Sequence, residues 1–160
     1  MREKILRGVM AGFTATLVLT AVMVVKLFTR FVPEINLAAL LSGAMHAPPW
    51  VGWGVHFVIG TFVWGPLFAL VVRRVPGSTC TVRGILFSVG AWLVMQLVVL
   101  PLAGMGVFGV AYGFMAPAVT LALHMIYGAV LGATYAWVKG EWRPPHVEDG
   151  AHGALRYTHY

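Results

Sequence analysis

Acidic side chains are scarce in this sequence. Its 160 residues include five Asp and Glu against eleven Lys and Arg, and charged residues make up only 10% of the chain. A soluble domain usually has about 25% charged residues, so that class is excluded. No acidic residue lies within any of the long apolar runs. Paired-carboxylate catalysis and an obvious coupling carboxylate for a transporter are therefore both missing.

Cysteine is nearly absent as well. Cys80 is the single cysteine, so the chain has neither a disulfide framework nor a thiolate metal cluster. A Ser-His-Asp set, a glycine-rich phosphate loop and zinc-ligand spacing are also lacking. An enzyme is the function that the sequence favours least.

Long hydrophobic runs dominate what remains. Apolar residues make up 59% of the chain and its mean hydropathy is +0.84. About 20 apolar residues in a helix cross a hydrocarbon core of ~30 Å. The sequence predicts an all-α integral membrane four-helix bundle in residues 1–139 and a polar tail in 140–160. The spans are expected at about 8–30, 51–72, 84–102 and 117–138.

Basic residues cluster at the ends of these runs and fall mostly on one side. Only Lys26 and Arg30 fall on the other. The positive-inside rule then predicts that both termini are cytoplasmic. Clustering of this kind is a signature of membrane topology and argues against a nucleic-acid partner. The nine basic residues on the cytoplasmic side are Arg2, Lys4, Arg7, Arg73, Arg74, Arg83, Lys139, Arg143 and Arg156.

Two connections have distinctive compositions. Residues 31–49 are apolar in part, too short to span and bounded by prolines, which predicts a short interfacial helix on the outer surface. Residues 103–117 form a glycine-rich linker whose role stays open. The tail histidines (His146, His152 and His159) are irregularly spaced and are typical of a solvated tail.

Spans two and four resemble each other. Val51–Leu70 and Val119–Val138 each contain one inner histidine, His56 or His124, followed four residues later by Gly60 or Gly128. Spans one and three both open with Arg-Gly and a branched aliphatic residue, at 7–9 and 83–85. The pattern indicates two tandem helical hairpins, related by an axis along the membrane normal.

Three segments carry a family resemblance: GWGVHFVIGTFVWGPLFAL, RGILFSVGAW with VVLPLAG, and APAVTLALHMIYGAVLG. They resemble an uncharacterised family of small four-span bacterial membrane proteins, and the likeness extends over residues 8–137. The resemblance implies a bacterial inner-membrane protein with the two histidine–glycine helices as its signature. It implies no activity.

The four spans each contribute one polar residue at a similar depth. We count depth from the basic residue at the cytoplasmic end of each span, at about 1.5 Å per residue. His56 and His124 then lie roughly 25 and 22 Å from that end, and Thr20 and Gln96 roughly 20 Å from it. A titratable ring inside a membrane is a candidate functional site. We expect these residues to share one layer, displaced toward the outer side.

This layer leads to a cofactor hypothesis. Spans two and four lie diagonally in an up-and-down bundle, roughly 11–14 Å apart if neighbouring helices are ~8–10 Å apart. His56 and His124 would then be axial ligands of a b-type haem. Gly60 and Gly128, one turn below them, would leave space for the ring, and Thr20 and Gln96 would lie nearby. The implied function is electron transfer, or an accessory role in a respiratory or quinol-linked complex, with homo-oligomers left open.

Three alternatives remain. The histidines could hydrogen-bond to Thr20 or Gln96, giving a cofactor-free structural or partner-binding subunit. Thioethers and imidazoles on the outer side also suit copper(I), and parallel repeats with a polar layer occur in small-solute carriers. The residues on which the copper hypothesis rests are Met45, His46, Met105, Met115, His124 and Met125.

Overall fold

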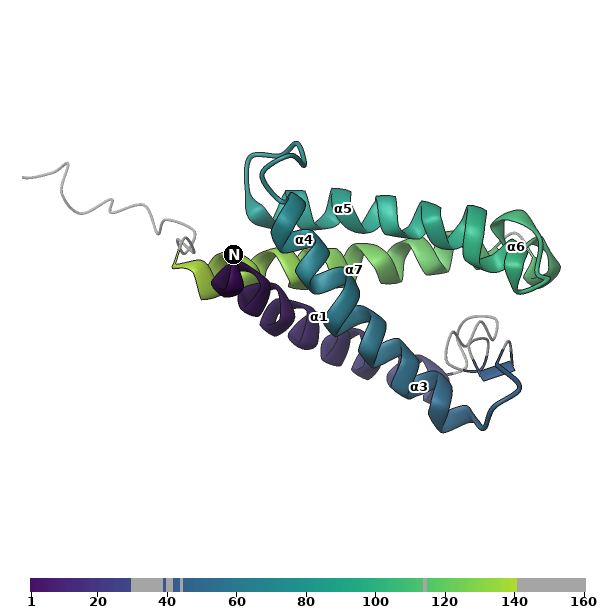
Figure 1. Ribbon diagram of the computed structural model, residues 1–160. Coiled ribbons are helices and arrows are strands. Elements are labelled where there is room, and N and C mark those ends of the chain that lie inside the picture. Colours follow the sequence, from purple (N-terminus) through teal and green to yellow (C-terminus); the bar gives the residue numbers. More distant parts are fainter. Residues whose placement is uncertain (30–38, 40–41, 44, 114, 141–160) are drawn as a thin grey trace, which may run out of the picture.

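The computed structural model describes residues 1–29, 39, 42–43, 45–113 and 115–140. Within these residues every regular element is helical (Figure 1). Four helical stretches are long and apolar enough to cross a membrane, which confirms the four-span prediction. They are Arg2–Lys26, Pro49–Val71, Cys80–Leu102 and Met115–Lys139. The predicted interfacial helix at 31–49 lies largely outside the described residues, and so do residues 141–160 of the tail.

Span one and span four are each a single long helix, α1 (Arg2–Thr29) and α7 (Met115–Lys139). Helix α1 begins about six residues before the predicted start, because its charged first turns contain no helix breaker and Arg7 reaches Glu3 at 3.5 Å. Inside α1, the hydroxyls of Thr16 and Thr20 donate to carbonyls one turn earlier, at 2.8 Å in both cases. Their polar groups are therefore satisfied within the apolar helix.

Spans two and three each contain a widened, π-helical turn. Each widened turn ends two residues before a proline, Pro66 or Pro101. Proline has no N–H and its ring collides with the carbonyl four residues back, and a widened turn relieves both problems. Span two consists of α3 (Pro49–Val58), η1 (Ile59–Trp64) and α4 (Gly65–Val71). Span three consists of α5 (Cys80–Val94), η2 (Met95–Val99) and α6 (Leu100–Leu102).

The two described connections are held by local hydrogen bonds and by glycine. In the loop before α5, the side chain of Thr79 accepts from Val82 N–H at 3.2 Å and caps the helix. Arg83 Nε donates to the carbonyl of Gly77 at 3.0 Å. In the glycine-rich linker, the chain turns through positive φ at several glycines around the short 3₁₀ segment η3 (Val107–Tyr112).

The helices follow one another around the bundle in chain order. Helix α1 packs against η1 and α4 on one side and against α7 on the other, and α5 packs along α7. Phe68 is fully buried at the centre, with ring contacts to Phe87 at 5.3 Å and to Tyr135 at 5.5 Å. Spans two and three are joined mainly by such ring contacts, which also include Trp64 with Phe87 at 5.8 Å. That side of the bundle is the loosest.

The first hairpin is held together by direct contact between backbones. A Cβ placed on Gly12 would lie 2.7 Å from the carbonyl oxygen of Gly60 and 2.9 Å from Cα of Gly65. A Cβ on Gly60 would collide with the hydroxyl of Thr16. Small residues on facing helices allow this close approach within a membrane.

The second hairpin repeats the same contact. A Cβ on Gly84 would collide with the carbonyl of Gly128 and lie 2.9 Å from Cα of Gly132, and one on Gly128 would lie 2.6 Å from Ser88 Oγ. Gly84 packs against Gly128 as Gly12 packs against Gly60, so Gly84 and Gly12 are equivalent in their contacts. The Arg-Gly sequence pattern had instead aligned Gly84 with Gly8, one helical turn earlier. The two hairpins therefore share the packing of their small residues. Their basic residues, Arg7 and Arg83, do not occupy equivalent positions relative to that packing.

Candidate functional site

His56 lies in α3 and is buried, with 7% of its surface exposed. Its imidazole meets the ring of Trp53 edge-on at 6.3 Å and that of Phe57 at 6.2 Å. Its Nε2 atom has no hydrogen-bond partner among the described residues. An unpaired buried polar nitrogen costs about 1–3 kcal/mol, which makes this atom a candidate ligand atom.

His124 lies in the first half of α7 and is half-buried. Its Nδ1 atom is 2.8 Å from the carbonyl oxygen of Thr120. Because a carbonyl only accepts, Nδ1 carries the proton, and the neutral ring then presents a lone pair at Nε2. The same arrangement orients metal-binding histidines in other proteins.

The two histidines come from different helices, α3 of span two and α7 of span four. Among the described residues, no hydrogen bond or ring contact joins them. In the described part of the chain, no group of three or more His, Cys, Asp or Glu side chains lies together.

Gly60 and Gly128 serve a different purpose from the one predicted. The space beside Gly60 is filled by Thr16, and that beside Gly128 by Ser88 and the backbone of Gly84. Each glycine faces the partner helix of its own hairpin. The predicted slot for a flat ring at these positions is therefore filled by neighbouring helices.

Gln96 is almost fully buried, with 1% exposed, in the widened turn η2. Its Nε2 donates to Thr120 Oγ1 at 3.1 Å, and Trp92 Nε1 donates to the same oxygen at 3.1 Å. Gln96 and His124 therefore both contact Thr120. Gln96 donates to its hydroxyl, and Nδ1 of His124 donates to its carbonyl. The Oε1 atom of Gln96 has no partner in the part of the chain that the structure describes.

Thr20 takes no part in this network. Its hydroxyl donates to the carbonyl of Thr16 in its own helix at 2.8 Å. The histidine rings have no hydrogen bond to Thr20 or to Gln96 among those found in the described residues. The residues of the expected polar layer therefore do not share one set of hydrogen bonds. Thr20 bonds within α1, whereas Gln96 and His124 both bond to Thr120.

Two features of the site were not expected from the sequence. The hydroxyl of Tyr127 donates to the Gly60 carbonyl at 2.7 Å and links spans four and two across the bundle. Thr120 is the acceptor that joins Trp92 and Gln96. The prolines at 66 and 101 could have indicated the widened turns, but the sequence contains no signal for these interhelical bonds.

Together, four apolar spans, tight contacts between small residues and an inner pair of histidines define a small helical integral membrane protein. The chain belongs to DUF6789, a family of unknown function, whose model matches residues 2–146. This confirms the resemblance to an uncharacterised family of small membrane proteins. No curated protein and no solved structure matches the chain.

Proposed function

We propose that this protein binds a b-type haem through His56 and His124 and serves in electron transfer within a membrane. The observation that supports the proposal is the buried, unpartnered Nε2 of His56, together with His124, whose Nε2 is left as an acceptor. A haem bound there supplies a one-electron couple, and the surrounding residues set its potential.

A purely structural role for the two histidines leaves the unpaired Nε2 atom of His56 unexplained. That alternative required bonds from the rings to Thr20 or Gln96, and these two side chains bond to Thr16 and Thr120 instead. Coordination to iron would satisfy the Nε2 atom of His56, which otherwise remains unpaired in a medium without water.

The fit of the porphyrin is partial. Each imidazole has an Nε2 atom that could bind the iron, whereas the space beside Gly60 and Gly128 is filled. Figure 1 shows α3 and the first turns of α7 diverging from one another. The ring would therefore have to lie on the side of the histidines that faces away from the two glycines.

The setting of this activity is part of the proposal. The family resemblance implies a bacterial inner membrane, and the distribution of Lys and Arg favours an orientation with both termini in the cytoplasm. A respiratory or quinol-linked complex, or a second copy of the chain, is then the partner that would exchange electrons.

The test is a visible spectrum of the protein purified from cells supplied with haem precursor. We expect a Soret band and sharp reduced α and β bands, which are lost in His56→Ala and in His124→Ala. His46→Asn is the matched control, because His46 is an exposed histidine whose positive φ of 50° asparagine tolerates. A colourless wild-type protein that takes up no added hemin would exclude the proposal.

A cofactor-free structural or partner-binding subunit is the second candidate. The glycine contacts within both hairpins favour it, because they account for Gly60 and Gly128 without a cofactor. A protein without a Soret band supports this candidate. If such a protein instead contains copper in amounts that His56→Ala abolishes, the histidine pair binds copper(I), for which two imidazoles suffice as ligands.

A further inference from the structure

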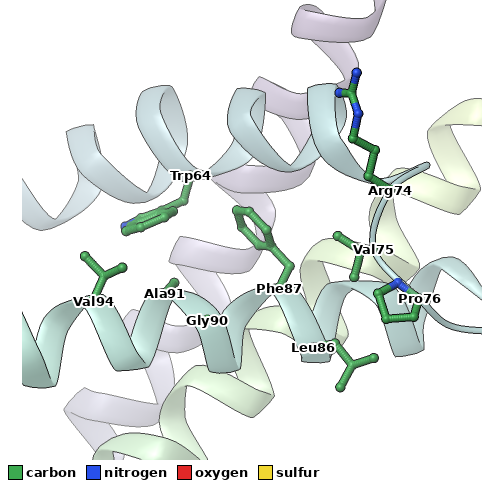
Figure 2. A pocket seen from close by; sticks show the side chains of 9 residues that line it. All are labelled: Trp64, Arg74, Val75, Pro76, Leu86, Phe87, Gly90, Ala91 and Val94. Carbon is green, nitrogen blue, oxygen red and sulfur yellow. The ribbon is translucent and has the colours of Figure 1, made fainter.

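A groove of ≈ 490 Å³ lies between α5 on one side and Trp64 of η1 and the loop after α4 on the other, on the loosest side of the bundle (Figure 2). Its apolar walls include Trp64 of span two and Leu86, Phe87 and Val94 of α5. The volume falls within the ~300–1,000 Å³ that is typical of small-ligand sites. From Leu86 to Val94 the wall runs for eight residues, or about 12 Å along the helix.

One end of this groove is basic. Arg74 lines it at the loop that joins spans two and three, and Figure 2 shows its guanidinium directed away from the apolar side chains. Arg74 is exposed. The loop also contains Arg73, Arg83 follows it at the start of α5, and no acidic residue occurs between 35 and 140. The apolar groove therefore ends next to a cluster of arginines, in the loop where spans two and three reach the membrane surface.

We propose that this groove binds an anionic phospholipid, with one acyl chain against Trp64 and Phe87 and the phosphate at Arg74. Acyl chains match an apolar groove, and anionic headgroups are attracted to basic residues next to a span. The site is separate from the histidine pair and does not depend on the haem proposal.

Charge favours a lipid over a second copy of the chain as the occupant. A span of another copy would bring no carboxylate to Arg74, because none of the spans contains an acidic residue beyond Glu3, which pairs with Arg7. A phospholipid supplies both the apolar chain and the negative charge in one molecule.

Gly90 provides the direct test of acyl-chain binding. It lines the groove, and a Cβ placed there would meet nothing within 4 Å. Gly90→Leu should fill the groove without disturbing the bundle. Gly54→Leu is the matched control, since Gly54 in α3 is equally open and lies outside the groove. Val94→Phe narrows the same groove and serves as a second variant if Gly90→Leu does not fold.

The full chain is reconstituted in vesicles of phosphatidylglycerol and phosphatidylcholine in equal parts, and retained lipid is counted by native mass spectrometry. Wild type and Gly54→Leu should retain one phosphatidylglycerol that Gly90→Leu loses. Arg74→Gln should lower the preference for phosphatidylglycerol about fivefold. Unchanged lipid retention in Gly90→Leu, no preference in the wild type, or a dimer that Gly90→Leu disrupts would each overturn the proposal.

Discussion

Replacing Gly84 by alanine should separate the two helices of the second hairpin. The new Cβ would collide with the carbonyl oxygen of Gly128 and lie 2.9 Å from both N and Cα of Gly132. All of these atoms belong to the backbone of α7, so no side chain can rotate away to make room. The helices must move apart, and the contacts along their whole interface weaken.

The expected magnitude follows from two opposing effects. Overpacking typically costs about 1–3 kcal/mol, with the upper end expected here because backbone must move. Alanine also gains up to about 1 kcal/mol over glycine within a helix. We therefore expect Gly84→Ala to lower the free energy of unfolding by about 2 kcal/mol.

Gly90→Ala is the control on the same helix. Its Cβ would meet nothing within 4 Å, so only the gain in helix propensity remains, up to about 1 kcal/mol. The assay is reversible unfolding in mixed micelles with increasing dodecyl sulfate, followed by circular dichroism. Equal stabilities of the two variants would show that the hairpin does not depend on backbone contact, and the reasoning would fail.

Two further substitutions test the interhelical hydrogen bonds in the same assay. Tyr127→Phe removes the bond to the Gly60 carbonyl and should cost only about 0.6 kcal/mol, the average for such bonds in membrane proteins; a loss above ~2 kcal/mol would contradict this. Thr120→Val leaves the buried amide of Gln96 and the part-buried indole N–H of Trp92 without their acceptor and should cost about 1–3 kcal/mol. It should also shift the tryptophan emission, and a variant as stable as wild type with unchanged emission would refute the role of Thr120.

Much of the candidate site was visible in the sequence, but not its bonding. The shared spacing of His56 and His124 within two similar apolar runs placed both of them inside spans, and they lie in α3 and α7. The same spacing could not show which way Gly60 and Gly128 face. That depends on the rotation of each helix, and rotation is set by packing against neighbours.

The sequence by itself determined the membrane fold. Lipid contains no partners for backbone polar groups, so an apolar run of about 20 residues has to be a helix, and four such runs give four spans. The two widened turns were also encoded locally, by Pro66 and Pro101.

Only the tertiary structure decided which small and polar residues meet. Contacts between Gly84 and Gly128, the link from Tyr127 to Gly60 and the groove beside Gly90 all join residues far apart in the chain. Inside a membrane the hydrophobic effect does not select among helix faces, because lipid is as apolar as the helices. Selection falls to steric fit and hydrogen bonding, which become apparent only when the helices are placed side by side.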